Sequence, residues 1–205
     1  MPYFVIQTVN QVLAFYSKLS QATQYIINEE GDPSVWLREG ISREVNSELL
    51  SKKYKKYLKV LTDCGRVRTS CVAPKYAIAG NKDQYYSGFA GSGAFRYSFI
   101  LQDGSSVVFG GEQVFSEYSH NKGKKKYAVI YYDTNGAKPP NRFGYDLFQF
   151  DLSDDGIYVN EKDFKAHITN GFYDSYWVIT HKNLDFQRCP IELQRGALGC
   201  KKKKK

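Results

Sequence analysis

Apolar residues recur at three- and four-residue steps through the first 30 residues of the chain. They are Val5, Val9, Val12, Tyr16, Leu19, Ile26 and Ile27, with Thr23 on the same face. This spacing predicts one helix over residues 2–29, because side chains three or four positions apart share a helix face. Pro2 suits the first helical turn, and Gly31 followed by Pro33 ends the run.

The other face of this predicted helix is polar. Its residues are Gln7, Asn10, Gln11, Ser17, Lys18, Gln21 and Gln24. A helix with one apolar stripe packs that stripe against another element. The rest of the chain must therefore supply a core that this helix covers.

Residues 34–62 favour a second helical region. In the segment "NSELLSKKYKKYLKVL" (46–61), leucines and tyrosines fall on one side and lysines on the other. We interpret the lysines as a solvated helix face rather than as a nucleic-acid footprint. The following segment "TDCGRVRTSC" forms a small loop between two cysteines, so residues 34–73 make up a helical and loop region.

From about residue 74 the pattern changes to strands and turns. Asp103-Gly104 lies between two apolar runs, which is a strong hairpin signal. The segment "KKKYAVIYYDTNG" (124–136) predicts a third strand, and "DLFQFDLSDDGIYV" (146–159) predicts a fourth that ends in an Asp-Gly turn. The segment "SYWVITHKNLDFQRC" (175–189) predicts a short strand with an irregular end.

A long helix followed by an antiparallel meander predicts an α+β fold in which the helix packs on the sheet. At 205 residues the chain has the length of one domain. We expect that domain to cover residues 1–200, with the sheet and a closing cysteine loop in residues 74–200. Residues 201–205 are five lysines, which we expect to form a disordered tail.

The net charge of +8 suggests an anionic partner, but the terminal lysines supply much of it. Without them the chain has 24 basic and 21 acidic residues, a net charge of +3. The folded body is therefore only mildly basic, and nucleic acid is not an expected partner on this ground.

The four cysteines fall into two closely spaced pairs, Cys64/Cys71 and Cys189/Cys200. Four cysteines allow three pairings, and sequence alone does not choose among them. Two local disulfides are the simplest arrangement, and free thiols or a metal site are the alternatives. A zinc site would favour C-x2-C spacing, which this sequence lacks.

Two sequence features point to different cellular compartments for this protein. Disulfides would imply an exported protein, yet the first residues lack the basic, apolar and cleavage-site parts of a secretory signal. No stretch approaches the 18 apolar residues of a membrane span. Either the protein is cytosolic, or an export segment has been removed, and disulfides would favour removal.

A search for catalytic motifs finds none. The sequence has no G-x-S-x-G, H-E-x-x-H, P-loop or G-x-G-x-x-G pattern. Its three histidines, His120, His167 and His181, are scattered along the chain. We therefore predict that the protein is not an enzyme.

The loop between the third and fourth predicted strands, residues 133–146, has two interpretations. Asp133, Asn135 and Asp146 offer oxygen ligands of the kind that Ca²⁺ prefers, and Gly136 permits a sharp turn. EF-hand spacing is missing, however. The favoured interpretation is a structured turn without a cofactor, in which the aspartates bind backbone N–H groups.

The same loop resembles a known family. The segment "DTNGAKPPNRFGYDLF" is similar to the D-x-N-G-x-x-x-P-N-x-x-G-x-D-x-F segment of bacterial type IV pilin-like proteins and type II secretion pseudopilins. The matching loop residues are Asp133, Asn135, Gly136, Pro140, Asn141, Gly144 and Asp146. Four other segments resemble the family in the same order: "VLAFYSKLSQAT", "KKYLKVLTDCG", "FILQDGSSVVF" and "WVITHKNLDFQRC" with the later Gly-Cys.

The resemblance implies a subunit of a filament on the cell surface, anchored in the inner membrane before assembly. Residues 2–29 would be the second half of a longer helix, whose membrane-spanning half and leader are missing here. That helix would contact other pilin or pseudopilin subunits, and the remaining domain alone would be a monomer. Relatives often carry an extra cysteine where Asp174 to Tyr176 stand here, and the even count favours Cys64–Cys71 and Cys189–Cys200 bridges.

The sequence is compatible with three functions. The first, which we favour, is a structural subunit, major or minor, of a type IV pilus or type II secretion filament. The second is a minor pilin at the filament tip that binds a glycan, DNA or a host protein through its 17 tyrosines. The third, a secreted enzyme, has no motif in its favour.

Overall fold

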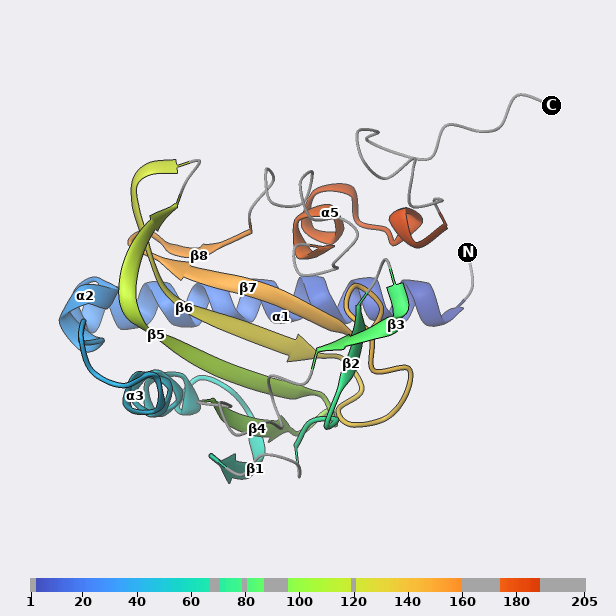
Figure 1. Cartoon of the computed structure of the whole chain (residues 1–205), viewed down its shortest axis with the longest axis horizontal. Helices are drawn as coiled ribbons and strands as arrows, with labels where there is room; N and C mark the ends of the chain where they lie inside the picture. Colours follow the sequence, from blue (N-terminus) through green and yellow to red (C-terminus); the bar gives the residue numbers. More distant parts are fainter. Residues whose placement is uncertain are drawn as a thin grey trace.

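The computed structural model shows a long helix, α1 (Tyr3–Glu30), lying across one face of an antiparallel sheet (Figure 1). The predicted α+β fold, with its amino-terminal helix and antiparallel sheet, is confirmed. The residues that the structure describes are 3–66, 71–78, 81–86, 96–118, 121–159 and 174–188.

Helix α1 buries one stripe along its length, as its sequence predicts. The buried apolar residues of the stripe are Val9, Val12, Phe15, Leu19, Ala22 and Ile26. Phe15 stacks on Tyr132 of the sheet with ring centroids 4.0 Å apart, and this contact fixes the helix over the middle of the core. The predicted stripe is wrong in one detail, because Phe15 is buried and Tyr16 is only half-buried.

Two short helices follow. Helix α2 (Pro33–Trp36) is capped by the Asp32 side chain, and helix α3 (Arg43–Lys55) is capped by the Ser42 hydroxyl. The helical prediction is wrong for residues 60–62, which belong to strand β1 (Val60–Gly65). This strand pairs antiparallel with β4, so pairing with residues far along the chain decides its conformation.

The main sheet is antiparallel throughout, in the order β1-β4-β5-β6-β7-β8. Its other strands are β4 (Tyr97–Leu101), β5 (Ser106–Tyr118), β6 (Asn121–Asp133), β7 (Leu147–Ser153) and β8 (Gly156–Tyr158). The predicted hairpin at Asp103-Gly104 joins β4 and β5, and Gly104 has a φ of 81°. The predicted Asp155-Gly156 turn joins β7 and β8.

Alternation along the strands gives the sheet two different faces. Residues such as Ile130 and Phe150 face α1 and form the larger core. Residues such as Val129 and Tyr131 face the other way and form a second, smaller core. Part of this second face is covered by a two-stranded sheet, β2 (Tyr76–Ile78) and β3 (Asn81–Tyr86), and by the loop that follows β6 (Figure 1).

The predicted strand after residue 175 is wrong, because this segment is a helix. Helix α5 spans Asp174–His181, and a 3-10 turn spans Asp185–Arg188. The β-branched run 178–180 suggested a strand, but Trp177 and Val178 are buried in the larger core. Packing on that core, with the Trp177 ring 4.0 Å from that of His181, overrides local propensity.

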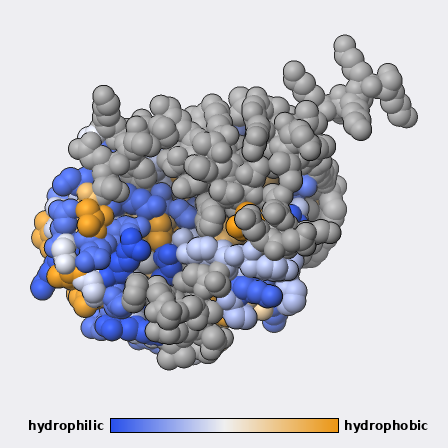
Figure 2. Space-filling model, in the orientation of Figure 1, coloured by the Kyte–Doolittle hydropathy of each residue, from blue (hydrophilic) through white to orange (hydrophobic). Residues whose placement is uncertain are grey.

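On the face of the molecule drawn in Figure 2, the surface of the described residues is mostly hydrophilic. In the view of Figure 2, hydrophobic residues form small separate patches, several at the end of the molecule where α2 lies and others nearer its middle. Patches of this kind are common on the surfaces of globular proteins. None of the helices in the described part of the chain has the length and hydrophobicity needed to cross a bilayer.

Candidate functional site

The family-like segment forms a closed loop between β6 and β7. Its ends are joined by a hydrogen bond of 2.8 Å from the Thr134 amide to the Asp146 carbonyl. Within the loop the Pro139–Pro140 peptide is cis. Asn141 has a φ of 51°, and Gly136 and Gly144 have φ values of 68° and 72°. Asn141, Gly136 and Gly144 of the motif therefore stand where the backbone needs left-handed conformations.

Asp133 lies buried at the start of the loop. One carboxylate oxygen accepts a hydrogen bond of 3.1 Å from the Asn135 amide, and the other accepts one of 2.5 Å from the Tyr76 hydroxyl. Burial raises the pKa of Asp133 well above its usual range, and repulsion from Asp146 raises it further. Asp133 thus connects the loop to β2 through a buried carboxyl group.

Asp146 lies buried at the end of the loop. Its two oxygens accept hydrogen bonds from the backbone amides of Asn141, at 2.7 Å, and Arg142, at 2.6 Å. Burial raises the pKa of Asp146 to about 6, although the bonds from Arg142 and Asn141 oppose this shift. Both aspartates of the motif therefore hold the loop backbone in place.

The proposed calcium ligands do not form a cation cage in this structure. The carboxylate oxygens of Asp133 and Asp146 all accept N–H or O–H donors. The Asn135 side chain donates to the Pro139 carbonyl at 3.0 Å. Within the described ranges, no three His, Cys, Asp or Glu residues are grouped so that they could hold a metal ion. This geometry fits the structured turn, and the absence of a bound metal stays a prediction.

A residue outside the motif packs directly on the loop. Asp174, the first residue of α5, lies so close to Gly144 that a Cβ added there would come 1.8 Å from its Oδ2 atom. Gly144 is therefore required both by its φ and by this contact. The Gln187 side chain also donates to the Gly144 carbonyl at 2.6 Å, so the 3-10 turn Asp185–Arg188 is attached at the same point.

Asp174 is a buried carboxyl group with few polar neighbours. It is 1% exposed, and neither of its oxygens has a hydrogen-bond partner among the described residues. Burial raises the pKa of Asp174 well above its usual range, and the Arg142 cation opposes this shift. No local pattern in the sequence signals this role, because Asp174 becomes buried only when α5 packs on the loop.

The structure describes one of the two cysteine pairs. Cys64 and Cys71 form a disulfide with their Cα atoms 6.2 Å apart, which confirms the predicted bridge. Both cysteines lie in the second core, next to the two-stranded sheet. Cys189 and Cys200 lie outside the described residues, so their pairing stays a prediction.

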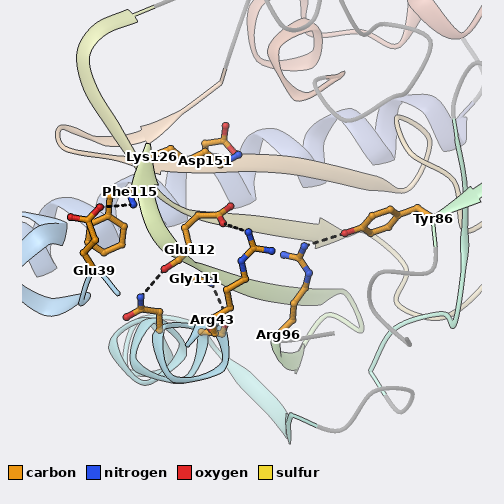
Figure 3. Close-up of polar contacts among 11 residues, drawn as sticks. Glu39, Arg43, Tyr86, Arg96, Gly111, Glu112, Phe115, Lys126 and Asp151 are labelled. Atoms are coloured by element: carbon orange, nitrogen blue, oxygen red, sulfur yellow. Dashed lines mark hydrogen bonds and ion pairs between the residues drawn. The ribbon is translucent and has the colours of Figure 1, made fainter. Parts of the chain in front are cut away.

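Polar residues occupy the second face of the sheet beyond the small core (Figure 3). Arg43 of α3 forms an ion pair of 3.4 Å with Glu112, and Arg96 donates to the Tyr86 hydroxyl at 3.1 Å. Lys126 and Asp151 form another ion pair at 3.3 Å. The motif search did not single out these residues, because they come from separate strands and helices.

Helix α3 is fixed on β5 beside these ion pairs. The Gly111 amide donates to the Ser47 hydroxyl at 2.9 Å, and the Asn46 side chain donates to the Glu112 carbonyl at 2.7 Å (Figure 3). A Cβ at Gly111 would come 2.4 Å from the Cβ of Asn46. The polar contacts in this region therefore hold α3 against the sheet, and this structural role accounts for the residues that form them.

A shallow groove lies on the exposed side of α1. It has a volume of about 360 Å³ and is lined by Ile6, Gln7, Asn10, Gln11 and Ala14. Gln11 also donates to the Thr134 carbonyl at 3.2 Å, so this end of α1 contacts the start of the loop. The groove offers apolar surface with carboxamide groups at its rim, which suits packing against another protein.

Comparison with known proteins gives no assignment. No protein family, curated protein or solved structure matches this chain.

Proposed function

We propose that this chain is the globular part of a structural subunit of a type IV pilus or type II secretion filament, assembled through α1. One observation supports this proposal most directly: the exposed face of α1 carries almost no charge. From Ile6 to Asn28, Lys18 is the one charged residue. Glu29 and Glu30 follow at the end of the helix.

A helix exposed to water normally carries charged residues on its polar face. Helix α3 of the same chain does so, with the sequence "REVNSELLSKKYK". Charged residues are depleted at the centres of protein interfaces, because their desolvation is costly. The uncharged polar face of α1, which is about 42 Å long, therefore fits contact with neighbouring subunits better than permanent exposure to water.

The groove on α1 supports the same assignment. Its lining residues belong to the exposed face, and Ile6 is 45% exposed. A ridge of side chains from a second helix could enter a groove of this kind. The carboxamides of Gln7 and Asn10 could then form hydrogen bonds across the contact.

The arrangement of elements also agrees with the family resemblance. The resemblance implies a helix that packs on an antiparallel sheet and also contacts other subunits. Here α1 buries one stripe in the core and leaves its other face exposed. The D-x-N-G-x-x-x-P-N-x-x-G-x-D-x-F loop contacts α1 through Gln11.

The test is filament assembly in cells that express the gene from its own locus. Ala14→Glu places a charge in the groove, and we expect it to abolish recovery of the protein in sheared filaments. Leu61→Glu is the matched control, because Leu61 is 64% exposed on β1, away from α1. Equal thermal midpoints of the two purified variants would show that both fold. Wild-type filament yield from the Ala14→Glu strain would contradict the proposal.

A further inference from the structure

Ala77 of β2 lies between two residues that are distant in sequence. It pairs antiparallel with Tyr85 of β3, and it forms a parallel bridge with Arg142 of the loop. The bridge has hydrogen bonds of 2.8 Å from the Ala77 amide to the Asn141 carbonyl and 3.0 Å from the Phe143 amide to the Ala77 carbonyl. Directly paired residues point to the same side of a sheet. Tyr85, Ala77 and Arg142 therefore form a row on one face of this small sheet.

The neighbouring residues in each segment point the other way, into the second core. Phe143 is fully buried, and its ring makes edge contacts with the rings of Tyr76 and Tyr86, with centroids 6.2 Å and 5.6 Å away. The row of Tyr85, Ala77 and Arg142 must then face away from that core. The exposed fraction of Tyr85, 52%, agrees with this orientation.

Each end of the row carries a cation next to a tyrosine ring. Lys75 Nζ lies 4.4 Å from the centroid of the Tyr85 ring, and Arg142 Cζ lies 4.3 Å from the centroid of the Tyr145 ring. Contacts of this length are cation–π interactions. We call Lys75, Ala77, Tyr85, Arg142 and Tyr145 the tyrosine platform.

The platform combines flat rings with positive charge. Tyr85 and Arg142 stand two strand spacings apart, about 10 Å, and the small side chain of Ala77 lies between them. Proteins that bind single-stranded nucleic acid use the same combination, since bases stack on aromatic rings and cations contact the phosphates. We propose that the tyrosine platform binds single-stranded nucleic acid, with bases on Tyr85 and Tyr145 and a phosphate at Lys75.

The distribution of charge supports this assignment, although the net charge of the folded body is small. Lys75 of the platform is exposed, whereas the carboxyl groups of Asp133, Asp146 and Asp174 are buried. A phosphate chain at the platform would thus meet the exposed Lys75 cation and no exposed carboxylate from those three residues. A single strand fits better than a duplex, because the base faces of a duplex are already stacked.

The experiment is fluorescence anisotropy of a labelled 12-nucleotide oligo-dT with the full chain in 50 mM NaCl. Tyr85→Ala is the decisive variant, because Tyr85 is half-exposed and its loss should not affect folding. The matched control is Tyr25→Ala. Tyr25 is 57% exposed, stacks on Tyr57 beside Lys56, and lies on α1. All variants keep residues 201–205, so the lysine tail contributes equally to each.

We expect Tyr85→Ala to weaken oligo-dT binding about five- to 150-fold, the range for loss of one stacked base, and Tyr25→Ala to leave it unchanged. Tyr145→Phe keeps the ring and should bind normally. Lys75→Ala should lower the slope of log affinity against log salt by about 0.7, as for one phosphate contact on a single strand.

Three outcomes would overturn the inference. The first is oligo-dT binding that Tyr85→Ala leaves within twofold of wild type, which would assign it to the lysine tail. The second is no measurable oligo-dT binding at all. The third is an effect of Tyr85→Ala confined to an acidic polysaccharide such as polygalacturonate, or to duplex DNA. Ala14→Glu should bind normally, so this test and the filament test can fail independently.

Discussion

The Tyr76 hydroxyl donates a hydrogen bond of 2.5 Å to the Asp133 carboxylate, which lies 57 residues further along the chain. Tyr76 is fully buried, and its hydroxyl also accepts a bond from the Ala73 amide. This one side chain therefore links the segment after the Cys64–Cys71 loop, the two-stranded sheet and the start of the 133–146 loop.

We predict that Tyr76→Phe lowers the free energy of unfolding by about 1–3 kcal/mol, because it leaves a buried carboxylate oxygen without its donor. Urea unfolding followed by circular dichroism measures the change. Tyr57→Phe is the control, since its hydroxyl contacts the exposed Glu29 side chain at 3.1 Å. A loss for Tyr76→Phe no larger than that of the control would mean that the buried bond contributes little.

Asp174→Asn should stabilise the protein at pH 7.5. Burial raises the pKa of Asp174, so above about pH 3.9 the folded state must keep a proton that the unfolded state releases, and this costs folding free energy that a neutral amide avoids. Each kcal/mol gained should raise the thermal midpoint by about 2–4 °C. The gain should vanish near pH 4, where both forms are neutral. A lower midpoint at pH 7.5 would show that the carboxylate is needed in its charged form, paired with Arg142.

The wild-type protein should be most stable at mildly acidic pH. The pKa of Asp146 is raised to about 6 in the folded protein, whereas an unfolded aspartate titrates near 3.9. The folded state therefore binds more protons between these values, and the free energy of unfolding falls as pH rises from about 4 to above 6. Asp133 and Asp174, whose pKa values are also raised, act in the same direction.

Thermal midpoints in a series of buffers from pH 4 to pH 8 measure this dependence. Asp146→Asn should lower stability at both ends of the series, because an amide cannot accept both backbone N–H bonds that the carboxylate accepts. A wild-type midpoint that rises steadily from pH 4 to pH 8 would rule out the predicted direction.

Calcium should have little effect on stability. The oxygens of Asp133 and Asp146 already accept donors from the protein, so a cation would have to displace those bonds. We expect the thermal midpoint to stay the same in calcium chloride and in EDTA. A calcium-dependent rise of several degrees would indicate a tightly bound cation and a rearranged loop.

The disulfides can be mapped directly. Peptide mapping without reduction should recover Cys64 linked to Cys71 and Cys189 linked to Cys200, and any other pairing would contradict the second bridge. Replacing both Cys64 and Cys71 with serine should cost about 2–3 kcal/mol, the chain-entropy value for so short a loop. Urea unfolding of the double variant measures that loss.

Features that depend on near neighbours in the chain could be predicted from the amino-acid sequence. Apolar residues at three- and four-residue steps predicted α1, because a helix brings residues with this spacing to one face. Asp103-Gly104 and Asp155-Gly156 gave the two tight turns, because glycine adopts the backbone angles that they need. Gly136, Asn141 and Gly144 of the 133–146 motif stand at positive φ, a conformation that Gly and Asn adopt most easily.

Features that depend on partners far along the chain could not be predicted in this way, because they form only when the chain folds. Residues 60–62 became a strand because β4 pairs with them, and residues 178–180 became a helix because the core accepts Trp177 and Val178 there. Asp174 is buried because α5 packs on Gly144. The tyrosine platform arises because β2 pairs with both β3 and the loop. Such contacts join residues far apart in the chain, and no local pattern records which of them will meet.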